Sequence, residues 1–184
     1  KSPQSRRQLT QAISEVLETE LSFREAELVS DVLIALLKQA EHDFRKTLAE
    51  RLSIMDGVPL RLVLHMANED IDIARPVLQK SSVLGEFDLL YIIKSKSAEY
   101  WRAIATRESL SEQVVDVLAD CNDFETALAL AENTNITLSN RVLNIFAEIA
   151  QGAETLAVPL LRRDEVSEEI ASMLYRYVSA EVRS

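Results

Sequence analysis

Glycine and proline are scarce in this sequence, with three glycines and four prolines among 184 residues. A β-rich chain needs many turn residues with special backbone angles, so this scarcity favours helices over strands. Cysteine is nearly absent too. The single Cys121 excludes an internal disulfide and a cysteine-based zinc site, and it is typical of a reducing compartment. Because the amino terminus has no signal-peptide pattern either, we expect a cytoplasmic protein.

Long apolar runs and catalytic motifs are also missing. No run approaches the roughly 18 apolar residues that a membrane-spanning helix needs, so we expect no membrane span. The sequence has no Gly-x-Ser-x-Gly elbow, no phosphate loop and no dinucleotide-binding glycine pattern. The two histidines, His42 and His65, are not spaced as paired metal ligands. We therefore predict no catalytic residue, no metal and no cofactor, and a protein that is not an enzyme.

Basic residues are outnumbered by acidic ones, 20 to 30, which gives a formal net charge of −10. Such a charge repels the phosphate backbones of nucleic acids. The pairs Arg6-Arg7 and Arg162-Arg163 are too short to form an electrostatic track, and we interpret them as solvated or capping residues. Nucleic acid is therefore not an expected partner.

The two ends of the sequence suggest that it is a piece of a longer protein. It begins at Lys1 rather than at methionine, and it ends within an expected helix from Glu168 to Val182. Segments outside this piece are expected to carry activity of their own if the whole protein has any.

Apolar residues recur at intervals of three and four, which is typical of helices. A first helix is expected from about Arg7 to Glu20, and Ser22 with Glu25 has the spacing of a capping box that starts a second helix near Phe23. A third is expected from about Glu41 to Ile54. The expected apolar stripes of these three helices are Leu9, Ile13, Val16 and Leu17; Leu28, Val32, Leu36 and Ala40; and Phe44, Leu48 and Leu52.

A repeat follows from Asp56 onward. Four similar segments end in the anchor residues Leu78, Ile104, Leu130 and Leu160, which are 26, 26 and 30 residues apart. Six positions after each anchor stands another apolar residue, namely Leu84, Leu110, Ile136 and Val166. Each repeat is interpreted as two short helices joined by a polar turn, at residues 68–70, 95–97, 120–122 and 151–152. Helices of about ten residues are marginal alone in water, so each pair must bury its stripes against neighbouring pairs.

We therefore predict an all-α fold: a right-handed stack of short antiparallel helix pairs, or α-solenoid. Residues 1–55 are expected to form an N-terminal helical segment that packs on the array or is used for self-association. Residues 56–184 are expected to form about four helix pairs.

The repeat segments also resemble a known family. Residues 71–84, Asp88-Leu-Leu90, residues 103–107 and Leu138-Ser139 resemble the mainly alphaproteobacterial domain of unknown function family 2336. The resemblance covers about Leu21 to Arg163, with Arg75 and the longer fourth spacing as departures. It implies HEAT-like helical repeats in a bacterial protein and, because the family has no established catalytic residues, it implies none here.

A polar column stands three positions after the anchors, at Ser81, Arg107, Asn133 and Arg163. Its side chains are expected to bond the free carbonyls at helix ends. The alternative is that Arg107 and Arg163 offer a row of donors to an acidic partner. Trp101 is a candidate interface anchor; alternatively it fills a gap between repeats while its neighbour Tyr100 lies half exposed.

The remaining polar groups are expected to be structural. We interpret Glu69, Asp70 and Asp72 as a solvated turn with a helix-capping aspartate rather than a cation site, and His65 as a partly buried, hydrogen-bonded histidine. Carboxylates 165, 168 and 169 are expected in the first turn of a helix after Ser167. Asp120 and Asp123 are expected to raise the pKa of Cys121, which makes a nucleophilic thiolate improbable.

Three functions remain open. The first is a protein-binding scaffold or adaptor that presents a groove to an unknown protein or peptide. The second is a homo-oligomeric module that pairs through residues 7 to 54, whose apolar stripes exceed what a single hairpin must bury. The third is a nucleic-acid-binding enzyme of the HEAT-like glycosylase type, which the net charge disfavours.

Overall fold

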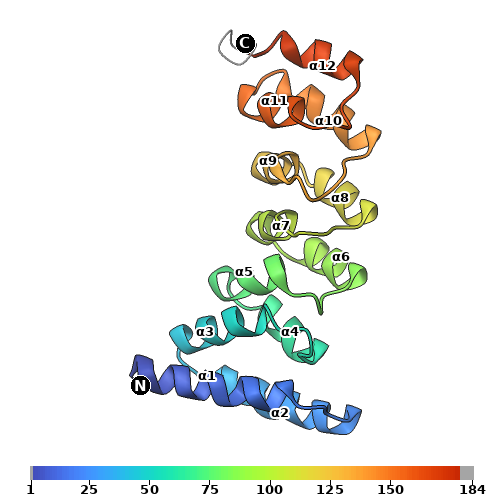
Figure 1. The fold of residues 1–184 in the computed structure, drawn as a ribbon. Helices are drawn as coiled ribbons and strands as arrows, with labels where there is room; N and C mark the ends of the chain where they lie inside the picture. The colour runs from blue at the N-terminus through green and yellow to red at the C-terminus, as the bar shows by residue number, and fades with distance from the viewer. Residues whose placement is uncertain (1, 179–184) are drawn as a thin grey trace. The chain divides into compact units, whose positions relative to one another are not determined.

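The computed structural model describes residues 2–178 and contains twelve helices and no strand within that range (Figure 1). The prediction of an all-α fold is confirmed. The chain forms two compact units, residues 1–95 and residues 96–184, which are described separately below. The predicted distinction between residues 1–55 and 56–184 stays a prediction.

Helix starts follow from capping side chains. Six helices begin after a serine or aspartate whose side chain accepts a hydrogen bond from the backbone N–H three residues later, namely Ser2, Ser22, Ser111, Asp123, Ser139 and Ser167. Each bond satisfies one donor that the first turn of a helix leaves unpaired. The helix predicted from Ser22 and Glu25 does start at Phe23, and the Ser22 hydroxyl also donates to the Glu25 carboxylate.

The first unit contains six helices in two rows. They are α1 (Pro3–Glu18), α2 (Phe23–Gln39), α3 (His42–Leu52), α4 (Leu60–Ala67), α5 (Ile71–Lys80) and α6 (Glu86–Ser95). In one row α1 packs on α3 and α3 on α5, while α2 packs on α4 beside them. Phe44, Leu48 and Leu52 of α3 are buried as predicted.

The predicted stripe of the second helix is wrong. Leu28, Val32 and Leu36 are exposed, and α2 instead buries Ser30, Leu33 and Leu37. The helix carries two apolar rows that lie side by side on its surface, and it packs its Leu33 row inward. On α1, similarly, Ile13 and Leu17 are buried whereas Val16 is exposed. Spacing alone did not distinguish the row that contacts the protein interior.

The second unit has the same two-row construction. Its helices are α7 (Ala98–Ala105), α8 (Glu112–Ala119), α9 (Phe124–Glu132), α10 (Asn140–Ala150), α11 (Glu154–Leu161) and α12 (Glu168–Tyr175). Helices α7, α9 and α11 contact one another in sequence, as do α8, α10 and α12. The helix predicted to reach Val182 ends at Tyr175, and residues 179–182 lie outside the described part of the chain.

The predicted anchors are fully buried. Leu78, Ile104, Leu130 and Leu160 have no exposed surface. The residues six positions later divide into two groups: Leu84 and Ile136 are buried, whereas Leu110 and Val166 are only partly buried. A charged residue at position 110 is therefore expected to cost less stability than one at a fully buried anchor. No helix among residues 2–178 is long and apolar enough to cross a membrane.

Candidate functional site: an apolar groove between the first two helices

An apolar groove runs between α1 and α2 of the first unit. One stretch, with a volume of about 360 Å³, is lined by Ala12, Ile13, Val16, Leu28, Val29, Val32 and Leu33. A second stretch of about 490 Å³ continues toward the start of α3 and is lined by Ser5, Arg6, Leu9, Ala35, Leu36, Gln39, Ala40, Glu41 and Phe44. We call the two stretches together the α1–α2 groove.

Both walls of the α1–α2 groove carry exposed apolar side chains. Val32 is 65% exposed, Leu28 60% and Val16 47%. Single exposed apolar residues are normal on a protein surface, but contiguous ones mark interaction sites. These three line the same stretch of the groove, and Leu36, which is 39% exposed, lines the next stretch.

The length of the groove suits a short helix. Its α1 wall runs from Ser5 to Val16, twelve residues that span about 16 Å, or three helical turns. On the α2 wall Leu28, Val32 and Leu36 are four residues apart, so they form a straight ridge. Amphipathic helices bind into grooves of this kind through apolar residues at matching intervals.

Ion pairs fix the α1–α2 hairpin to the next hairpin. Arg6 of α1 lies 3.2 Å from Asp43 of α3, and Glu18 lies 3.4 Å from Arg51. Arg61 of α4 contacts Glu27 and Asp31 of α2. Of the residues in these pairs only Arg6 lines the groove, so the ion pairs hold the hairpin in place and leave the Leu28 stretch of the groove open.

Arg163, which was expected to bond helix-end carbonyls or alternatively to bind an acidic partner, turns inward. Its side chain is 5% exposed, and Nη1 donates to the carbonyls of Ala131 at 3.0 Å and Asn133 at 2.8 Å, at the end of α9 one repeat earlier. Nη2 donates to the carbonyl of Ile136. A hollow of about 610 Å³ lies beside Arg163, but these donors already face backbone oxygens.

Glu165 completes this cluster instead of standing in the first turn of α12 as predicted. It accepts hydrogen bonds from the Leu138 N–H at 3.0 Å and from Arg163 Nε at 2.8 Å. Burial raises the pKa of Glu165, but these hydrogen bonds outweigh it and hold the pKa below its ordinary value. Glu168 and Glu169 do lie in the first turn of α12.

The other members of the polar column point inward as well. Asn133 donates through Nδ2 to the carbonyls of Ala105 at 2.9 Å and Arg107 at 2.8 Å, again one repeat earlier. Ser81 has no exposed surface and accepts a hydrogen bond from the Val83 N–H. Arg107 is 8% exposed, and burial lowers its pKa. The column therefore lies inside the protein rather than on a free face.

The two aromatic residues of α7 differ from the alternative in which Trp101 fills a gap between repeats and Tyr100 lies half exposed. Tyr100 is buried, with the Lys96 ammonium 5.3 Å from its ring centre, whereas Trp101 is partly exposed. The expectation of a half-exposed Tyr100 is wrong, because the face of α7 that packs inward carries Tyr100, Ala103 and Ile104. The interpretation of Trp101 as an interface anchor stays a prediction.

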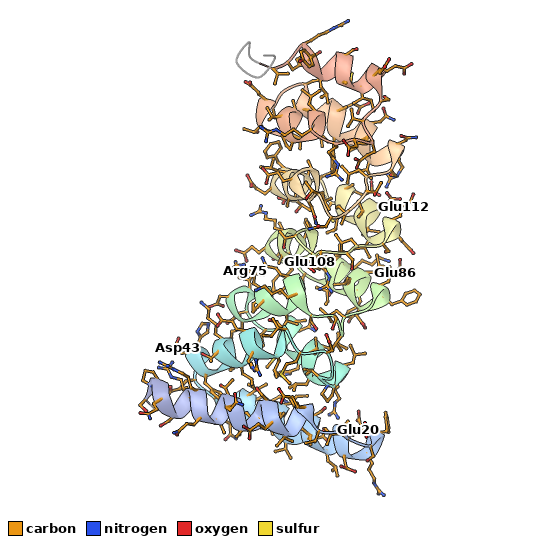
Figure 2. The ribbon with its side chains drawn as sticks, viewed as in Figure 1. Glu20, Asp43, Arg75, Glu86, Glu108 and Glu112 are labelled. Atoms are coloured by element: carbon orange, nitrogen blue, oxygen red, sulfur yellow. The ribbon has the colours of Figure 1, made fainter. Side chains whose placement is uncertain are left out.

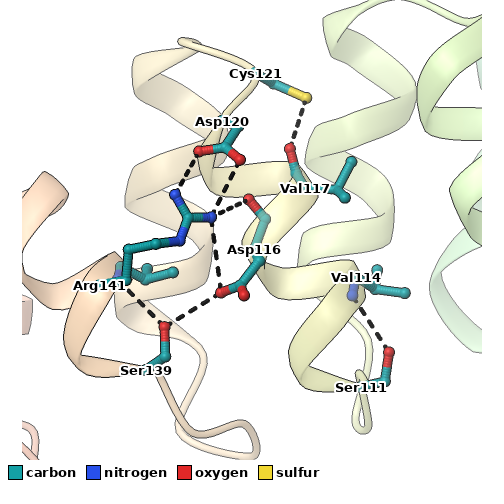
Figure 3. Close-up of polar contacts among 9 residues, drawn as sticks. Ser111, Val114, Asp116, Val117, Asp120, Cys121, Ser139 and Arg141 are labelled. Carbon is teal, nitrogen blue, oxygen red and sulfur yellow. Dashed lines mark hydrogen bonds and ion pairs between the residues drawn. The ribbon is translucent and has the colours of Figure 1, made fainter.

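Salt bridges that sequence reasoning missed join neighbouring repeats of the second unit. Figure 3 shows Arg141 of α10 between Asp120, 2.9 Å away, and Asp116 of α8. Arg102 of α7 binds both oxygens of Asp123, and its hydrogen bonds hold the pKa of that carboxyl far below its ordinary value. Arg141 and Asp120 are 21 residues apart in the sequence, and so are Arg102 and Asp123. A search for opposite charges slightly less than one repeat apart could therefore have found these two pairs.

The remaining titratable groups of the turns also have structural partners. His42 lies 2.6 Å from Asp72, and Glu69 binds Arg45 at 2.8 Å and lies 3.4 Å from His65. Asp70 precedes α5 without a side-chain capping bond, contrary to its predicted capping role. Among residues 2–178 no cluster of histidine, cysteine and carboxylate side chains is arranged to hold a metal ion.

Cys121 should react slowly with thiol reagents. Burial and then the charges of Asp120 and Asp123 raise its pKa, and its Sγ donates to the Val117 carbonyl (Figure 3). A raised pKa means less thiolate near neutral pH, so we expect iodoacetamide to alkylate Cys121 more slowly than glutathione at about pH 8. The difference should shrink as the pH rises. Mass spectrometry measures both rates, and an Asp120→Asn variant that reacts no faster would contradict this explanation.

Comparison with protein families gives a match over the later part of the chain. Residues 73–184 match the model of a family described as an uncharacterised protein conserved in bacteria. The match begins at Ile73 in α5, later than the resemblance from about Leu21 suggested, so the α1–α2 groove lies outside it. No curated protein and no solved structure matches the chain.

Proposed function

Because the chain belongs to the domain of unknown function family 2336, which has no assigned activity, we propose a function from the chain's own surface: a non-catalytic protein-interaction module that takes up an apolar helix in the α1–α2 groove. The proposal includes a HEAT-like stacking of the helix pairs and a cytoplasmic location, which the single cysteine supports. The family match covers more than half of the chain.

The observation that carries the proposal is the open ridge of Leu28, Val32 and Leu36. An array of helix pairs buries the apolar face of each pair against a neighbour, so an apolar face that no described helix covers calls for another cover. The α1–α2 hairpin packs on α3 and α4, and no other described helix covers the groove. The exposed apolar walls of the groove therefore favour the binding of a partner that covers them.

A crosslinking experiment tests the groove in cells. A photoreactive phenylalanine derivative is placed at Val32, and at Arg24 on the same helix as a matched exposed control. We expect an adduct at position 32 that mass spectrometry maps to an apolar helical segment. The adduct should disappear when Leu36→Glu places a charge in the groove, because a charge buried without a partner opposes binding.

The control position decides how the result is interpreted. Both positions are exposed, so non-specific collisions should label them equally. Equal labelling at positions 24 and 32, adducts that persist in Leu36→Glu, or no adduct at position 32 would each overturn the proposal.

A further inference from the structure

The α1–α2 hairpin has a strong charge asymmetry along its length. The end that contains residues 2–10 and 33–40 carries three basic residues, Arg6, Arg7 and Lys38, and no acidic one. The end that contains residues 11–32 carries one basic residue, Arg24, and six acidic ones, namely Glu15, Glu18, Glu20, Glu25, Glu27 and Asp31. Figure 2 labels Glu20 at the acidic end, where α1 leads into α2.

Some of these charges already bind the rest of the first unit. Arg6 contacts Asp43, Glu18 contacts Arg51, and Arg61 contacts both Glu27 and Asp31. Arg7 and Lys38 at the basic end, with Glu15 and Glu20 at the acidic end, are exposed. The asymmetry therefore persists at the solvent-exposed positions of the hairpin.

We propose that the occupant of the α1–α2 groove is the α1–α2 hairpin of a second copy of this chain, turned end for end. This inference rests on the proposed function, since it names the partner of the same groove. A two-fold axis across the hairpin brings the basic end of each copy to the acidic end of the other. The apolar ridges then meet in the middle, and the two hairpins form a four-helix bundle.

The second copy explains both features of the hairpin at once. The groove needs an apolar helix, and the second copy supplies the ridge of Leu28, Val32 and Leu36. In an antiparallel pair centred on Val32, Leu28 of one copy lies opposite Leu36 of the other. The net charge of −10 opposes self-association in general. In the end-for-end arrangement, however, the basic end of each hairpin attracts the acidic end of the other.

The size of the surface sets the expected strength. Helix α1 has 16 residues and is about 24 Å long, and two helices side by side are about 20 Å wide, which gives a footprint of about 480 Å². Stable interfaces bury about 800 Å² per partner, so this one belongs at the weak end. We expect a reversible dimer with a dissociation constant in the micromolar range.

Sedimentation equilibrium of the full chain tests the pairing. We expect the wild type to shift from monomer to dimer as its concentration rises, and Val32→Arg to weaken the association at least about tenfold. Val32 is exposed in the single chain, so this variant should keep its helical circular dichroism. A wild type that stays monomeric up to about 500 µM would overturn the inference. A dimer that Val32→Arg leaves unchanged would overturn it as well.

Charge reversal tests the orientation independently. Arg7→Glu with Lys38→Glu makes both ends of the hairpin acidic, and Glu15→Lys with Glu20→Lys reduces the net charge of the second end from −5 to −1. Each double variant should dimerise more weakly than the wild type, while an equimolar mixture should form a heterodimer, because the strongly acidic end of the first variant then meets the unchanged basic end of the second. A mixture that associates no better than either variant alone would overturn the end-for-end arrangement.

The two proposals can fail separately. A purified chain that stays monomeric, together with Val32 adducts that contain another protein, overturns the second-copy inference and supports the interaction module. Absence of any groove adduct, together with a dimer that Val32→Arg leaves intact, overturns both.

Discussion

Replacing Arg163 by methionine should destabilise the second unit by about 3–5 kcal/mol. The substitution keeps much of the side-chain volume but removes every donor of the guanidinium. The carbonyls of Ala131, Asn133 and Ile136 would lose hydrogen bonds from a charged donor, and Glu165 would lose its ion pair. Urea denaturation followed by circular dichroism measures the loss.

The neighbouring Arg162 provides a matched control. It is exposed at the end of α11, so Arg162→Met removes the same charge from the same region without removing buried hydrogen bonds. We expect it to change the free energy of unfolding by no more than about 0.5 kcal/mol. Equal effects of the two substitutions would mean that Arg163 acts through its charge alone, contrary to the geometry.

Leu130→Ala, which truncates the anchor of α9, should lower the free energy of unfolding by about 2–5 kcal/mol. Leu130 has no exposed surface, and α9 packs on both α7 and α11, so the lost side chain leaves a cavity between layers that are each held by their neighbours. The expected loss combines the transfer of the removed methyl groups with the cavity that remains. Thermal and urea unfolding of the variant measure it.

Leu128→Ala on the same helix is the comparison. Leu128 is only partly buried, so its truncation removes fewer contacts and leaves no closed cavity. We expect a clearly smaller loss of stability than for Leu130→Ala. A Leu128 effect as large as that of Leu130 would contradict the interpretation of the anchors as the points where successive helix pairs meet.

The repeat could be predicted from the sequence because its physical cause is local. Anchors 26 to 30 residues apart each need a buried site, and the four anchors do have no exposed surface. Capping serines fix helix starts through contacts within three residues, so the start of α2 at Phe23 followed directly from Ser22. Such short-range causes are visible in one sequence.

The groove could not be located in the same way. Helix α2 has two apolar rows, and the sequence indicates both equally well; only packing on α4 determines that the Leu33 row is buried and the Leu28 row is exposed. The excess of apolar surface on the first helices was nevertheless visible, and it had suggested self-association. The identity of the exposed row is a tertiary property.

The polar column shows the same limit for charged residues. An arginine after a helix end is equally compatible with a buried cap and with an exposed donor. Arg163 became a buried cap because the preceding repeat places the carbonyl oxygens of Ala131, Asn133 and Ile136 within its reach. Those acceptors are 27 to 32 residues away in the sequence, so no local pattern contains them.

Hydrogen exchange of the purified chain, compared between dilute and concentrated solution, tests most directly whether the α1–α2 groove is the surface that a second copy covers. We predict that exchange slows with concentration in α1 and α2 and stays unchanged in α4 to α12. Slowing confined to other helices, or identical exchange at both concentrations, would contradict that assignment.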